Sequence, residues 1–191
     1  TGYNNVAIGF WSLYENTTGN HNTAVGRNAL KENTTAENNS AFGYGALYSN
    51  TTGTRNLAIG KGALYSPDTE NDNLAIGYHA LYGSIDGGEY NVAVGNYALD
   101  ANTSGDNNIG LGYNSLTANT TGSVNVAIGS QALDANTTGG SNVAVGYSAL
   151  GANVSSNYNT GIGRQALSNT TGAVNTSLGY RAGDIITSPA L

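Results

Sequence analysis

The part of the chain with the most chemical potential lies between residues 48 and 90, where an otherwise regular pattern is interrupted. Three tyrosines, Tyr48, Tyr65 and Tyr82, recur there at intervals of 17 residues, each directly after a leucine. The irregular segments 66–72 and 83–90 carry five of the twelve carboxylates, among them Asp68, Asp72 and Asp86. Aromatic faces beside carboxylates can stack on sugar rings and accept hydrogen bonds from hydroxyls, so these six residues form a candidate glycan site. The alternative is that the tyrosines only cover a core beside a solvated acidic turn.

Other chemistry finds little support in the residue types. Paired carboxylates could hydrolyse a glycoside, but that reaction needs a cleft and one desolvated acid, and carboxylates in turns are usually solvated. His21 and His79 are far apart in sequence, and the chain has no Cys, so no zinc-ligand spacing occurs. Gly43-Tyr44-Gly45 matches only part of a dinucleotide-binding fingerprint. We therefore expect no enzymatic activity, no metal and no cofactor.

The chain is also rich in acceptor sequences for N-glycosylation, which fall in its turn-like Asn-Thr-Thr-Gly segments and their variants. Such a sequon is suited to modification where it lies on an exposed turn, although Asn-Thr-Thr-Gly is also simply a good turn sequence. The candidate acceptors are Asn16, Asn33, Asn50, Asn102, Asn119, Asn136, Asn153 and Asn169.

These residues must be positioned by a repeating unit. An Asn-x-Ala-x-Gly motif or a close variant starts at Asn5, Asn22, Asn39, Asn56, Asn73, Asn91, Asn108, Asn125, Asn142, Asn159 and Asn175. The interval is 17 residues, except for 18 after Asn73 and 16 after Asn159. So short and regular a period indicates one small unit stacked on copies of itself. We predict that residues 1–191 form a single all-β array, a parallel β-solenoid of about eleven coils.

Each coil is expected to contain two short strands. The first, for example residues 126–128, alternates a large apolar residue with a small one, and the Gly that follows it predicts a bend. The second ends at a recurrent Leu, such as Leu133, and an Asn-Thr-Thr-Gly turn closes the coil. We expect the small columns that begin at Ala7 and Ala29 to face outward as flat stripes that need a partner. Alternatively, Ala is there because a tight coil has no room for more.

The residue after the bend Gly forms a further column. Alternate coils carry an aromatic residue, at Phe10, Tyr44, Tyr78, Tyr113, Tyr147 and Tyr180. The coils between them carry Arg27, Lys61, Asn96, Ser130 and Arg164. The strand spacing places these rings roughly 9.6 Å apart. They either pack between subunits or form a ladder that binds an extended polymer.

The composition argues against nucleic acid and anionic membranes as partners. With 28 Gly, 9% charged residues and a net charge of -6, the chain lacks the basic clusters that bind nucleic acid or an anionic membrane. No segment is long and apolar enough to cross a membrane, and no signal peptide precedes Thr1. Because the repeats run almost from one end to the other, the chain looks like an excerpt from a longer protein.

The repeats resemble a known family. Residues 22–26, 91–95 and 125–129 (NTAVG, NVAVG and NVAIG) are similar to the head repeats of trimeric autotransporter adhesins, the YadA-like head, and the Asn-Thr-Thr-Gly linkers resemble a longer variant that also occurs in phage tail-fibre-like proteins. The resemblance implies a left-handed parallel β-roll that assembles as a homotrimer.

The resemblance further implies an extracellular location, on a cell surface or a virion fibre, and a rigid surface for binding host or matrix glycans. We therefore expect the head or shaft of an adhesin or tail fibre. The alternative is a self-assembling extracellular filament that binds only its own kind.

Overall fold

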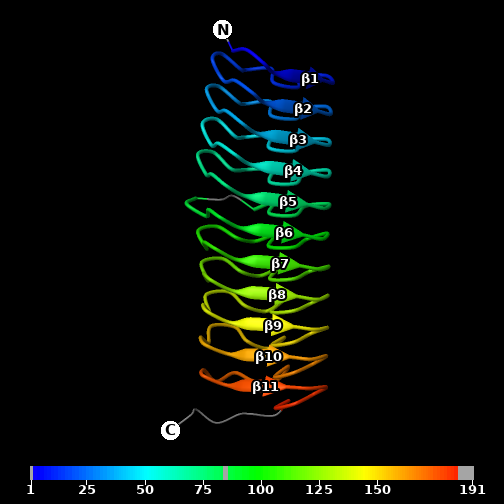
Figure 1. Ribbon diagram of the computed structural model, residues 1–191, viewed down its shortest axis with the longest axis vertical. Coiled ribbons are helices and arrows are strands. Elements are labelled where there is room, and N and C mark those ends of the chain that lie inside the picture. The colour runs from blue at the N-terminus through cyan, green and yellow to red at the C-terminus, as the bar shows by residue number, and fades with distance from the viewer. Residues whose placement is uncertain (1, 84–85, 185–191) are drawn as a thin grey trace.

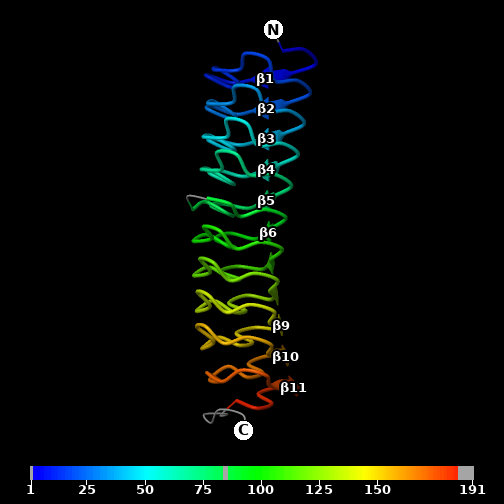
Figure 2. The ribbon, with the colours of Figure 1, turned by 90° about the vertical axis from the view of Figure 1, so that its left-hand side faces the viewer.

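The computed structural model describes residues 2–83 and 86–184, which form one straight stack of coils (Figures 1 and 2). Its strands are β1 (Val6–Ile8), β2 (Thr23–Val25), β3 (Ser40–Phe42), β4 (Leu57–Ile59), β5 (Leu74–Ile76), β6 (Val92–Val94), β7 (Ile109–Leu111), β8 (Val126–Ile128), β9 (Val143–Val145), β10 (Thr160–Ile162) and β11 (Thr176–Leu178). Each strand directly follows one of the eleven motif asparagines. No helix long and apolar enough to cross a membrane occurs in the described residues.

The strands form one parallel sheet in which sequence order equals spatial order. Equivalent residues pair between coils, as in Ala7 with Ala24 and Ala127 with Ala144. The extra residue after Asn73 leaves this register intact, since Leu74 still pairs with Val92. The predicted all-β parallel solenoid is therefore confirmed.

The two faces of the strand are reversed relative to our expectation. The small residue at the strand centre is fully buried, as at Ala24 and Ala127, and so is the column that begins at Ala29. A Cβ added at Gly110, which takes the strand-centre position in β7, would lie 3.4 Å from Cγ of Leu99. The interior thus has room for one Leu per coil opposite a small residue, and the large strand residues point outward.

The predicted second strand is wrong. The residues around each core Leu form turns, and the Leu itself has a positive φ, 51° at Leu133 and 48° at Leu30. Its backbone N–H still donates to the next coil, from Leu133 to the carbonyl of Ala149 at 3.0 Å. The left-handed conformation turns the side chain into the core, where Leu30 through Leu167 are fully buried.

The predicted glycine bend is confirmed at the end of each strand. These glycines have φ between 128° and 140°. A Cβ at Gly26 would lie 2.4 Å from the carbonyl oxygen of Gly43 on the next coil. Because both the backbone angle and the close approach exclude a side chain, only glycine fits this corner.

Two columns of buried asparagines hold the coils together. In the first, each motif Asn accepts a hydrogen bond from the backbone of its successor; Asn142 N–H donates to Oδ1 of Asn125 at 3.0 Å. The Nδ2 of Asn125 donates to the carbonyl of Gly139 at 2.8 Å. This column, the motif ladder, satisfies main-chain groups that the short strands leave without partners.

The second column, the turn ladder, is made of the sequon asparagines other than Asn169. Nδ2 of Asn119 donates to Oδ1 of Asn102 at 2.8 Å and to the carbonyl of Gly122 at 2.9 Å. Asn136 repeats the pattern on Asn119 at 2.8 Å. Amide side chains, each with donors and an acceptor, can repeat this arrangement indefinitely along a stack.

Candidate functional site

The turn ladder corrects the expectation of exposed glycosylation sites. Six of the eight candidate acceptors are fully buried with Nδ2 engaged in the ladder or its turn: Asn33, Asn50, Asn102, Asn119, Asn136 and Asn153. Asn16 is half-buried, and Asn169 is exposed because Thr170 takes the ladder position in its coil. Only Asn169 thus keeps the accessibility that a sequon needs.

We expect the folded protein produced in glycosylating cells to carry no glycan at Asn119, because a glycan would replace one of the two buried Nδ2 donors and Asn119 is fully buried. Site-resolved mass spectrometry of the folded fraction measures this, with Asn169 as the accessible comparison. Substantial occupancy at Asn119 in folded protein would contradict the ladder.

The three predicted tyrosines do lie together, on consecutive coils. The rings of Tyr48 and Tyr65 are stacked at 4.9 Å and 9°, and those of Tyr65 and Tyr82 lie at 5.1 Å and 32°. All three are half-buried, and burial raises the pKa of the Tyr65 hydroxyl. Their faces are largely occupied by one another, which leaves ring edges and hydroxyls for other contacts.

The predicted acids lie elsewhere. Asp68 and Asp86 line a separate polar hollow of about 730 Å³, which shares no lining residue with the tyrosine cluster. Its buried acid, Glu70, accepts hydrogen bonds from the backbone N–H groups of Asp68 and Gly87, at 2.9 and 3.0 Å. This carboxylate therefore stabilises the two irregular turns that contain Asp68 and Gly87.

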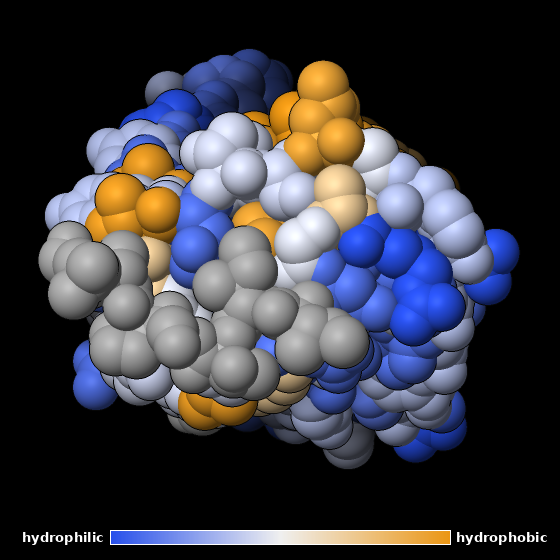
Figure 3. Space-filling view, turned by 90° about the horizontal axis from the view of Figure 1, so that it is seen from below, coloured by the Kyte–Doolittle hydropathy of each residue, from blue (hydrophilic) through white to orange (hydrophobic). Residues whose placement is uncertain are grey.

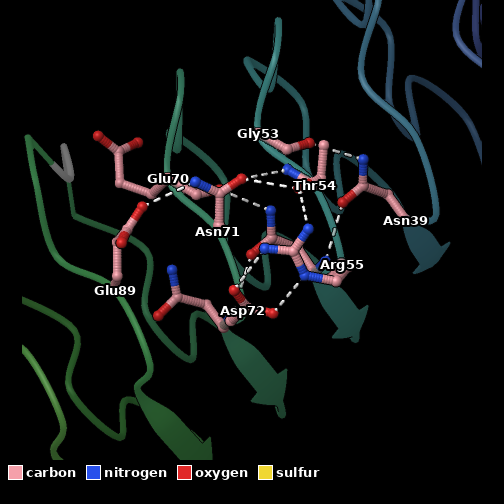
Figure 4. A network of polar contacts seen from close by, with 10 residues as sticks. Asn39, Gly53, Thr54, Arg55, Glu70, Asn71, Asp72 and Glu89 are labelled. Carbon is pink, nitrogen blue, oxygen red and sulfur yellow. Dashed lines mark hydrogen bonds and ion pairs between the residues drawn. The ribbon is translucent and has the colours of Figure 1, made fainter.

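Asp72 lies in a third place, in a network of turn residues (Figure 4). The Arg55 guanidinium donates two hydrogen bonds of 2.7 Å to it and holds the pKa of its carboxyl below the ordinary value. Next to this pair, Asn71 bridges Thr54 and Glu89. The six predicted glycan-site residues thus divide between a tyrosine cluster, an acidic hollow and an ion pair.

A second hollow, the aromatic notch, has a volume of about 340 Å³. It is lined by Tyr44, Lys61, Gly62, Tyr65, Tyr78, His79 and Tyr82. The imidazole of His79 is stacked between the rings of Tyr78 and Tyr82, 4.0 Å from each and within 10° of parallel. Burial lowers the pKa of His79, which favours the neutral form of this imidazole.

At some coils of the column after the bend, a cation lies between two aromatic rings. The Lys61 Nζ lies 5.9 Å from the Tyr44 ring centroid and 5.5 Å from that of Tyr78. Arg164 lies between Tyr147 and Tyr180 in the same way, at 5.6 and 5.8 Å. Within the described residues, neither cation has a carboxylate within ion-pair distance. Their positive charges remain available at the surface, stabilised by the ring faces.

The notch was not predicted from the sequence, because the residues that open it are glycines and carry no side chain. The second position after the bend has a positive φ in every coil and carries side chains such as Asn28, His79 and Gln131, but Gly at 45 and 62. A Cβ at Gly45 would lie 2.9 Å from the Tyr65 ring, and one at Gly62 3.0 Å from the His79 ring. These two glycines therefore make room for the rings.

Comparison of the chain with protein-family models, curated proteins and solved structures finds no match.

Proposed function

We propose that this chain is a non-enzymatic extracellular module, the head or shaft of a trimeric adhesin or tail fibre. In it, three copies of a left-handed β-roll pack through their sheets and display a rigid, glycan-binding surface. The resemblance of the repeats to adhesin head repeats supports the handedness, the number of copies and the extracellular location. The sheet itself supports self-association.

The outer face of the sheet carries this proposal. The large strand residues form an unbroken column: Ile8, Val25, Phe42, Ile59, Ile76, Val94, Leu111, Ile128, Val145, Ile162 and Leu178. Ile59, Leu111 and Ile128 are 39%, 42% and 37% exposed, whereas the small residues on the opposite face are fully buried. Seen along the rod, hydrophobic residues reach the surface between hydrophilic ones (Figure 3).

The length of this face explains why it needs a partner. Because the strands pair in register, its side chains repeat every 4.7–4.9 Å, so eleven coils give an apolar column on the order of 50 Å long. Soluble monomers rarely expose apolar patches of more than a few hundred Å². Packing against other copies buries the column without changing the coil.

The assembly is tested by light scattering coupled to size-exclusion chromatography. We expect the mass of a trimer for the wild type, and a monomer for Leu111→Lys with Ile128→Lys, which places two charges in the centre of the interface. The matched control, Thr121→Lys with Thr138→Lys, adds the same charges to exposed turns of the same two coils and should stay trimeric. A monomeric wild type would overturn the proposal, and open-ended growth would favour the filament.

A further inference from the structure

The aromatic notch has the features of a ligand site rather than of a core. Tyr44 is 47% exposed, Lys61 is exposed, and Tyr78 and His79 are half-buried. The hollow is lined by four tyrosines, a histidine and a lysine, together with Gly62. Its volume of about 340 Å³ falls within the roughly 300–1,000 Å³ usual for small-molecule sites, near the lower end.

The chemistry of the notch defines its ligand. The exposed ring surface, chiefly that of Tyr44, accepts the apolar C–H side of a sugar ring, and hydroxyls and the imidazole can exchange hydrogen bonds with sugar hydroxyls. The decisive group is Lys61, a cation on a chain of net charge -6 that has no carboxylate partner within the described residues. A carboxylate on the ligand would supply that partner through a charge-assisted hydrogen bond.

We propose that the aromatic notch binds an acidic sugar residue, a pyranose that carries a carboxylate, with Lys61 as the anion-binding group and Tyr44 and Tyr78 as its walls. This inference rests on the proposed glycan-binding function. It moves the site from the acids Asp68, Asp72 and Asp86 to the side of the tyrosine cluster that carries Lys61, and it specifies an anionic ligand.

The chain contains its own comparison for this proposal. Arg164 lies between Tyr147 and Tyr180 with nearly the same distances as Lys61 between Tyr44 and Tyr78. The residue after Arg164 is Gln165, whereas the residue after Lys61 is Gly62. A cation between two rings therefore occurs at both places, but only Lys61 borders the notch that Gly62 opens.

The test uses a β-1,4-linked glucuronate tetrasaccharide and the β-1,4-linked glucose tetrasaccharide, which differ only in the carboxylate at C6. Titration calorimetry on the full chain should show at least tenfold tighter binding of the acidic sugar, as expected for one charge-assisted hydrogen bond. Lys61→Gln should abolish that preference. Gly62→Ala should weaken the binding of both sugars at least tenfold, because its Cβ presses on the rings of His79 and Tyr82.

Arg164→Gln is the matched control and should bind like the wild type. Circular dichroism and a melting curve establish that each variant is folded, and the backbone at position 62 tolerates Ala because equivalent positions with the same φ carry side chains. Equal binding of the two sugars, no binding at all, or equal loss in Arg164→Gln would each overturn the proposal. Light scattering on the same samples reports the assembly separately, so a trimer without acidic-sugar preference refutes this inference alone.

Discussion

Replacing Leu133 by Asp is expected to unfold the middle of the rod. Leu133 is fully buried in an interior that is one Leu wide, so the substitution removes core volume and buries an unpaired charge. Leu→Ala alone costs about 2–5 kcal/mol in protein cores, and the charge adds to that cost. Because each coil is held mainly by its neighbours, coils seven to nine should open together. Hydrogen exchange read by mass spectrometry should show protection lost between residues 108 and 158.

Two variants separate the causes of this effect. Leu133→Ala keeps the core uncharged, so it should lose only the stability that the Leu side chain contributes by its burial and packing. Thr138→Asp places the same charge on an exposed turn of the same coil. Its free energy of unfolding should stay within about 0.5 kcal/mol of the wild-type value. An unchanged melting curve for Leu133→Asp would mean that the Leu column faces solvent.

Asn125→Ala is expected to be nearly as damaging, although it removes few apolar contacts. The amide of Asn125 accepts hydrogen bonds from the backbone N–H of Asn142 and from its Nδ2, and donates to the carbonyl of Gly139. Truncation leaves the buried N–H of Asn142 without a partner, at about 1–3 kcal/mol. It also removes one bond each from Nδ2 of Asn142 and the carbonyl of Gly139, which keep their bonds to the Ser156 carbonyl and Asn136 Nδ2. We expect a loss of about 2–5 kcal/mol in the free energy of unfolding, measured by chemical denaturation.

Asn157→Ala is the matched control, because Asn157 also accepts a backbone hydrogen bond from a neighbouring coil, in this case from Gly140 on the preceding coil, but lies at the surface where water replaces it. Its cost should stay below about 1 kcal/mol. Equal losses in the two variants would show that burial of the motif ladder contributes nothing to its strength.

The sequence predicts the coil, but it does not predict which side chains of the strand point into the core and which point to solvent. The period of 17, the position of each strand and the glycine bend follow from side-chain alternation and backbone sterics, which are local. Which face of Val126–Ile128 points inward depends on what lies across the coil, and the buried Leu column leaves room only for small residues such as Ala127. The prediction of a second strand was wrong for a related reason, because no feature of the sequence indicates that a Leu has a positive φ.

The candidate site shows the same limit. Stacking of coils correctly brings Tyr48, Tyr65 and Tyr82 together, because equivalent positions repeat along the rod. The direction of each side chain is set by neighbours on other coils, so the separation of Asp72 from the rings was not predictable. Asn119 resembles an exposed sequon in sequence, and only the stack turns it inward.

The hydrogen bonds between coils lie along the length of the rod, and this sets how the molecule carries mechanical load. A pull on its two ends loads these bonds directly and separates one coil from the next. A released coil of 17 residues extends from about 5 Å to roughly 55–60 Å, which lengthens the chain by roughly 50 Å per coil. Because the coils are nearly equivalent, they yield one after another at similar forces, and the rod dissipates a sudden tension over many small steps instead of breaking at one.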